Sequence, residues 1–110
     1  MKRTKNMYIN PSHEANELEL YALHCDENLY RWLWNIVGNL KKHYKRGNYD
    51  ADRAIDAFYP VMTEAAKRYM REFCNIGPGP FSVTDRFTAA AAMVEHFEED
   101  ITENCLLFMN

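Results

Sequence analysis

The sequence predicts an all-α protein, a small bundle of four principal helices around a central antiparallel helical hairpin. Apolar residues recur at steps of three and four through residues 50–73, which places them on one side of a helix. The segments on either side repeat this spacing, and no stretch shows the alternation of a strand. A chain of 110 residues with 47% hydrophobic residues suits one helical domain over residues 1–110.

The first half of the chain contains signals for two helices. After an irregular arm over residues 1–10, the first helix is expected to begin behind Pro11 and Ser12 and to end near Cys25. Asp26 is a suitable N-cap for a second helix over residues 29–46. Basic residues crowd the last turns of this helix and Gly47 follows it, as is typical of a helix C-terminus.

A third helix is expected over residues 50–74. The short connection at residues 47–49 makes the second and third helices an antiparallel hairpin. Pro60 lies in the middle of the third helix, where proline removes a hydrogen bond and crowds the preceding turn. The sequence therefore predicts either a kink or two helices that meet near Pro60.

The last part of the chain is expected to form a linker, a fourth helix and a tail. Gly and Pro dominate the linker at residues 75–82, and Ser82 or Thr84 would cap the helix. Residues 106–110 form an apolar tail. The first and fourth helices should cover the hairpin. The residues expected in the core are Leu33, Ile36, Leu40, Ile55, Phe58, Met62, Tyr69, Phe87 and Val94.

Charge and cysteine content restrict the function classes only mildly. With 13 basic and 16 acidic residues the net charge of -3 is too small to indicate nucleic acid or membrane as a partner. The three cysteines show no paired spacing, and no apolar run follows the basic residues at the start of the chain. We therefore expect no signal peptide, no membrane span, reduced thiols and a cytoplasmic location.

Several short motifs stand in a recognisable order. They are Leu18-Glu19-Leu20-Tyr21, Leu29-Tyr30-Arg31, Asn39-Leu40-Lys41-Lys42, Gly47-Asn48-Tyr49-Asp50, Ala65-Ala66-Lys67-Arg68-Tyr69 and Glu72-Phe73. With these motifs in this order, the chain resembles a family of small proteins encoded by bacteriophages and other bacterial mobile elements. The likeness covers residues 18–99, with departures at Pro60, Trp32 and Trp34. The resemblance implies a phage or plasmid origin and a host-cytoplasm setting, and it lends no activity.

Tyr30, Trp34 and Lys41 form a second line on the predicted second helix, rotated from its main apolar stripe. Large aromatic side chains at such positions can form an exposed protein-interaction surface, because Trp and Tyr dominate interface energetics. The alternative is that this helix lies in the interior and buries two faces.

A second candidate interaction surface is acidic and consists of Glu95, Glu99, Asp100 and Glu103. Carboxylates near a helix C-terminus oppose the helix dipole, so a reason for their presence is worth seeking. They could dock on a basic partner or imitate nucleic-acid charge. The alternative is a solvated surface that keeps the protein dissolved.

A basic cluster ends the second helix and provides an alternative, nucleic-acid-binding surface. Its residues are Lys41, Lys42, Lys45 and Arg46. They could contact phosphates, with neighbouring tyrosines available for stacking. Cations at a helix C-terminus also interact favourably with the helix dipole and need no ligand.

The sequence contains no recognisable catalytic, metal or nucleotide motif. His13 with Glu17, and His96 with Asp100, each offer two metal ligands, which do not make a site. We expect no cofactor and no enzymatic activity. The leading hypothesis is a non-enzymatic interaction protein of phage or mobile-element origin that binds a host or phage protein and modulates a host protein or defence system. Homo-oligomerisation belongs to the same class, and the alternative is a small nucleic-acid-binding accessory protein.

Overall fold

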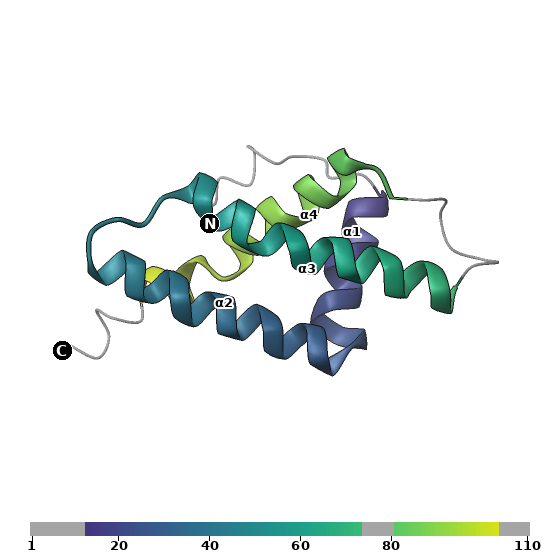
Figure 1. Cartoon of the computed structure of the whole chain (residues 1–110), viewed down its shortest axis with the longest axis horizontal. Helices are drawn as coiled ribbons and strands as arrows, with labels where there is room; N and C mark the ends of the chain where they lie inside the picture. The colour runs from purple at the N-terminus through teal and green to yellow at the C-terminus, as the bar shows by residue number, and fades with distance from the viewer. Residues whose placement is uncertain (1–12, 74–80, 104–110) are drawn as a thin grey trace.

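The protein is built from helices packed in two layers (Figure 1). A computed structural model describes residues 13–73 and 81–103, and no strand occurs in these two ranges. The predicted all-α class with four principal helices is therefore confirmed. The arm at residues 1–10, the tail at residues 106–110 and most of the linker lie outside the described residues.

Two short π-helical segments accompany the four principal helices: one continues the first helix toward the second, and the other follows the fourth. The elements are α1 (His13–Leu20), η2 (Tyr21–Cys25), α2 (Glu27–Lys45), α3 (Ala51–Glu72), α4 (Val83–His96) and η3 (Glu99–Glu103). The first predicted helix corresponds to α1 continued by η2. Asp26 alone separates η2 from α2, so the chain turns sharply there.

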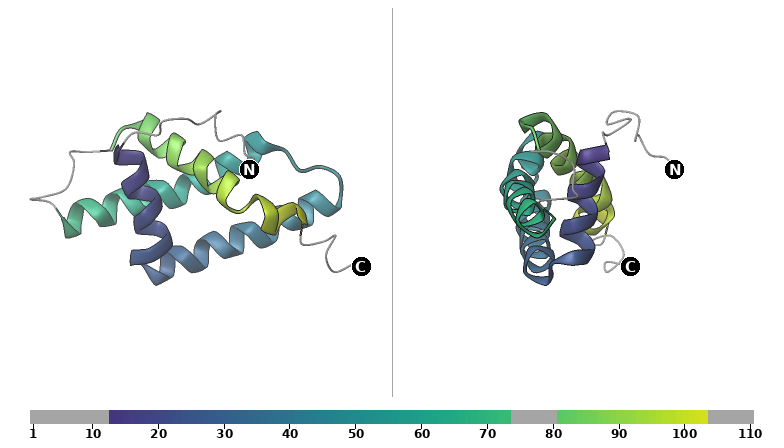
Figure 2. Two further views of the ribbon diagram at one scale, coloured as in Figure 1. Left: turned by 180° about the vertical axis from the view of Figure 1, so that it is seen from behind. Right: turned by 90° about the vertical axis from the view of Figure 1, so that its right-hand side faces the viewer.

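The helices α2 and α3 run antiparallel in one layer, and α1, with the segment from α4 to η3, covers one face of them (Figure 2). The most extensive packing joins α3 to α4. Ala89, Ala90 and Ala91 are fully buried in α4, and such small side chains let another helix approach closely. Further contacts join α1 to α4 and α2 to η3.

Eight of the nine predicted core residues are buried, and Phe87 is the exception. Its side chain is 47% exposed, because the buried face of α4 is centred nearer to Ala90, Met93 and Phe97. Phe87 lies at the edge of that face, one turn before the buried alanines. The prediction was wrong here because the apolar stripe of α4 is wider than the surface that its neighbours cover.

Pro60 lies inside one continuous helix, so the alternative of two helices is excluded. Pro60 and Asp56, whose carbonyl loses its usual partner, are both exposed. Water can therefore satisfy the carbonyl that proline leaves unpaired, while Phe58, Val61 and Met62 keep the opposite side in the core.

Side chains cap two of the helices. Asp26 Oδ1 accepts hydrogen bonds from the N–H groups of Asn28 and Leu29 at 3.0 and 3.1 Å. Ser82, rather than Thr84, caps α4 in a reciprocal capping box with Asp85. Asp50 occupies the N-cap position of α3, but its side chain makes no capping hydrogen bond.

Asp26 also joins α2 to α3. Arg68 Nη1 donates to Asp26 Oδ2 at 2.9 Å, and Arg68 Nε donates to Glu64 at 3.0 Å. Burial alone would raise the pKa of Asp26, but the hydrogen bonds from Arg68 and from the N–H groups of α2 outweigh it and lower that pKa. One carboxylate therefore starts α2 and ties it to the last turns of α3.

Glu19 of α1 is a partly buried carboxyl. Burial, with a smaller repulsion from Glu95 of α4, raises the pKa of Glu19 to about 7. Between pH 4.5 and about 7 the folded protein holds a proton that the unfolded chain has released. The contribution of Glu19 to the free energy of unfolding therefore falls as the pH rises through this window.

Phe58→Ala should lower the free energy of unfolding by about 3–5 kcal/mol, because Phe58 is fully buried and the substitution leaves a cavity. Phe87→Ala is the matched control on an exposed ring and should cost less than about 1 kcal/mol. Urea denaturation of the two variants measures both values. Equal losses would contradict the core boundary described above.

Asp26→Ala should lower the free energy of unfolding by about 2 kcal/mol, because it removes a helix cap and a half-buried ion pair together. Asp50→Ala also replaces an aspartate at an N-cap position, but one without a capping bond, and should change stability by less than about 0.5 kcal/mol. Thermal and urea unfolding at neutral pH test this difference. Similar values for the two variants would show that the Asp26 contacts contribute little.

Glu19→Gln should raise the free energy of unfolding near pH 8 by about 1 kcal/mol, allowing for the partial exposure of Glu19. Near pH 4 it should change stability little, because the carboxyl is then protonated in both states. Glu98→Gln, at an exposed position, is the control. Urea unfolding across this pH range would contradict the assignment if Glu19→Gln gave a constant difference.

Candidate functional site

Two large aromatic side chains lie side by side on the surface of α2. Tyr30 and Trp34 are 40% and 39% exposed, and their rings meet edge to face with centroids 6.3 Å apart. We call Tyr30 and Trp34 the aromatic surface. The alternative that α2 lies in the interior is excluded, because α2 buries a single stripe. That stripe consists of Leu29, Leu33, Ile36, Val37 and Leu40.

The aromatic surface rests on the core through Phe97. The rings of Trp34 and Phe97 meet edge to face with centroids 5.1 Å apart, and Phe97 is only 2% exposed. Phe97 in turn stacks on the fully buried Phe58 of α3 at 6.0 Å. One side of Trp34 is therefore held by the core while the remainder faces solvent.

Trp32 provides a comparison on the same helix. It is 37% exposed, close to the value for Trp34. Because successive residues turn by about 100° around a helix, the two tryptophans point to well-separated sides of α2. Within residues 13–73 and 81–103, Trp32 makes no ring contact. It is an exposed tryptophan without the support that Phe97 gives Trp34.

The predicted acidic set does not form one uniform face. Glu95 is half-buried on α4 and interacts with Glu19 of α1, whereas Glu99 and Asp100 lie on η3, exposed and half-buried. The side chain of Glu103 lies outside the described residues. Asp100 also interacts with His96. Burial lowers the pKa of His96, an effect that Asp100 opposes and His24 reinforces.

The predicted basic set lies on and just beyond the last turns of α2. Lys42, Lys45 and Arg46 are exposed, Lys41 is half-buried, and none of the four forms an ion pair within the described part of the chain. The segment η3 packs against α2 (Figure 2), so acidic side chains share this region with the basic ones. This mixture of charges weakens the positive potential that phosphate binding requires.

Arg68 of α3 does not lie beside the basic set. Arg68 is engaged by Asp26 and Glu64 at the end of the α2–α3 hairpin opposite the basic set. It cannot extend the basic set into a continuous surface, as expected for antiparallel helices.

The residues considered for metal binding stay in pairs. His13 Nε2 lies 3.5 Å from Glu17 Oε2, and His96 interacts with Asp100. No group of three or more His, Cys, Asp or Glu side chains suited to a metal ion occurs in the described ranges. Cys25 is a free, exposed thiol, and Cys74 and Cys105 lie outside those ranges.

None of the described helices has the length and apolar character to cross a membrane.

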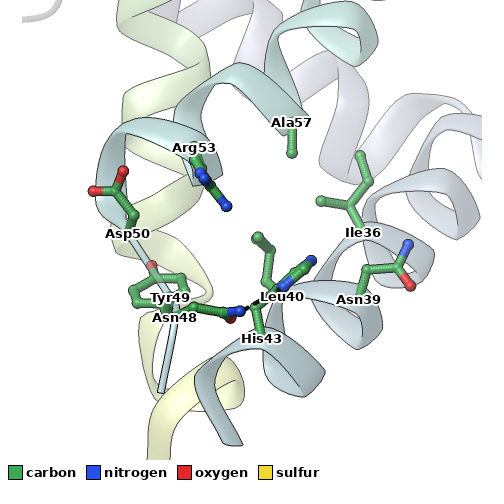
Figure 3. A pocket seen from close by; sticks show the side chains of 9 residues that line it. All are labelled: Ile36, Asn39, Leu40, His43, Asn48, Tyr49, Asp50, Arg53 and Ala57. Atoms are coloured by element: carbon green, nitrogen blue, oxygen red, sulfur yellow. Dashed lines mark hydrogen bonds between the residues drawn. The ribbon is translucent and has the colours of Figure 1, made fainter. Parts of the chain in front are cut away.

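A hollow that the sequence did not predict lies where α2 connects to α3 (Figure 3). It has a volume of about 170 Å³ and is lined by residues of α2 between Ile36 and His43 and by residues 48–57. His43 Nδ1 and Asn48 Oδ1 are 3.3 Å apart, which joins α2 to the connection. The sequence signal is weak, because these residues are brought together only by the path of the connection after Gly47, whose φ of 80° favours glycine.

Comparisons with known proteins add no assignment to this geometry. No protein-family model, no curated protein and no solved structure matches the chain.

Proposed function

We propose that this protein is a non-enzymatic interaction protein that binds a host or phage protein through the aromatic surface. One observation carries the proposal: Tyr30 and Trp34 stand about 40% exposed while Phe97 holds Trp34 against the core. Tryptophan and tyrosine are enriched among the residues that dominate protein–protein binding energy.

The support beneath Trp34 favours binding. A side chain that is free in solution loses conformational entropy when a partner immobilises it, at a cost of about 0.5–1.5 kcal/mol. Trp34 contacts both Tyr30 and Phe97 before any partner arrives, so less of its freedom remains to be lost. The aromatic surface thus offers apolar area at a reduced entropic cost.

Neighbouring charges would add selectivity. Glu99 and Asp100 lie on η3, which packs against α2 and begins two residues after Phe97. Acidic groups beside an aromatic anchor favour a partner with basic residues and disfavour an acidic one. In this proposal the acidic residues choose the partner, and Tyr30 and Trp34 supply most of the affinity.

The resemblance to small phage-encoded and mobile-element-encoded proteins supports a setting for this activity. A protein of that origin would act in the cytoplasm of a bacterial host and modulate a host protein or defence system. Homo-oligomerisation through the aromatic surface belongs to the same proposal, with a second copy as the partner.

Affinity capture of the tagged protein from host-cell extract, with and without nuclease, tests the proposal. We expect a protein partner that survives nuclease treatment and whose dissociation constant rises at least about tenfold in Trp34→Ala. Trp32→Ala is the matched control, since it removes an equally exposed tryptophan from the same helix and should leave binding unchanged. Sedimentation of the purified protein identifies the case in which the partner is a second copy.

Two results would contradict the proposal. Equal loss of binding in the two tryptophan variants would mean that the aromatic surface is not the contact. Capture that disappears with nuclease would favour the nucleic-acid alternative, for which charge reversal of the basic set should abolish a salt-dependent shift of labelled DNA or RNA.

A further inference from the structure

We propose that the hollow between α2 and α3 binds a small anionic ligand with a single apolar ring, of the aromatic monocarboxylate class. This inference is independent of the proposed interaction function. No residue of the aromatic surface lines the hollow, which lies toward α3 and beside the α2–α3 connection (Figure 3).

The size and the walls of the hollow define the apolar part of the ligand. Its volume of about 170 Å³ is close to that of a protein cavity of about 150 Å³ that accepts benzene. Ile36 and Leu40 of α2 and Ala57 of α3 supply the apolar walls. Figure 3 shows the Leu40 side chain directed toward the middle of the hollow, where it would contact a ring.

The polar groups around the hollow define the charged part of the ligand. The guanidinium of Arg53 points toward the middle of the hollow, and the Asp50 carboxylate points away from it (Figure 3). Arg53 makes no ion pair or hydrogen bond to any described residue. A guanidinium presents a planar fork of donors that matches a carboxylate.

Two polar side chains of α2 also line the hollow, and the Asn39 amide is directed away from its middle (Figure 3). Asn39 and His43 line the hollow across from Arg53, and the contact with Asn48 orients the His43 ring. Because Asn48 Oδ1 accepts from His43 Nδ1, the other ring nitrogen, Nε2, is an acceptor in the neutral imidazole and donates only in the imidazolium form. Among the described residues that line the hollow, Arg53 is the only lysine or arginine, and the only carboxylate, that of Asp50, is directed outward.

Titration of the ¹⁵N-labelled full chain with benzoate tests the inference. We expect saturable changes in amide chemical shifts centred on the residues that line the hollow. Inorganic phosphate has the charge without the ring, and benzyl alcohol has the ring without the charge. Each should bind at least about tenfold more weakly than benzoate if both parts of the ligand are recognised.

Three variants locate the site. Arg53→Gln should raise the benzoate dissociation constant about tenfold, whereas Arg71→Gln, at an exposed position on the same helix, should leave it unchanged. Ala57→Met introduces a larger side chain at the apolar wall and should abolish binding. Far-UV circular dichroism and thermal unfolding establish that each variant is folded before its titration is interpreted.

The inference would be overturned by non-saturating shifts with benzoate, or by shifts centred away from the hollow. Phosphate binding as tight as benzoate would show that only the anion is recognised. Equal binding by benzyl alcohol would show that Arg53 contributes nothing. Equal effects of Arg53→Gln and Arg71→Gln would reduce the interaction to general attraction between charges.

Discussion

The contact on which the rest of the structure depends is the packing of Phe97 against two helices at once. Phe97 stacks on Phe58 of α3 and meets Trp34 of α2 edge to face, while remaining almost completely buried. It follows the last residue of α4, so it joins the end of that helix to the α2–α3 layer. The same ring closes the core and supports the exposed tryptophan.

Polar contacts hold the other end of the bundle. Asp26 begins α2 and binds Arg68 of α3. Nearby, the Tyr21 hydroxyl donates to Glu72 at 2.8 Å, and the Tyr69 hydroxyl donates to Glu17 at 3.0 Å. In the first of these hydrogen bonds η2 donates to α3, and in the second α3 donates to α1. They define the orientation of α1, whose own apolar surface is short, and hydrogen bonds constrain orientation more closely than apolar contact does.

The two proposed binding regions use different sides of α2. Tyr30 and Trp34 lie on the side of α2 that contacts Phe97. The hollow lies on the side of α2 that faces α3. The hollow is lined by Ile36 and Leu40 of the core stripe and by no residue of the aromatic surface, so a partner on the aromatic surface need not cover the hollow. A protein partner and a small ligand could therefore bind together.

The sequence by itself determined the helices and most of the core. Apolar spacing, caps and the residues around Gly47 locate α2 and α3, because these signals act within one or two turns of the chain. The capping box at Ser82 is equally local. The burial of Phe58 and Leu33 follows from their places at the centre of strong apolar stripes.

Only the tertiary structure decided which surface positions matter. Trp32 and Trp34 are equally exposed on the same helix, and the approach of Phe97 distinguishes Trp34 from Trp32. Phe87 fits the stripe of α4 but lies beyond the area that neighbouring helices cover. The hollow beside Arg53 arises from the path of the connection between two helices. Each of these features depends on contacts between residues far apart in the chain, which local periodicity does not encode.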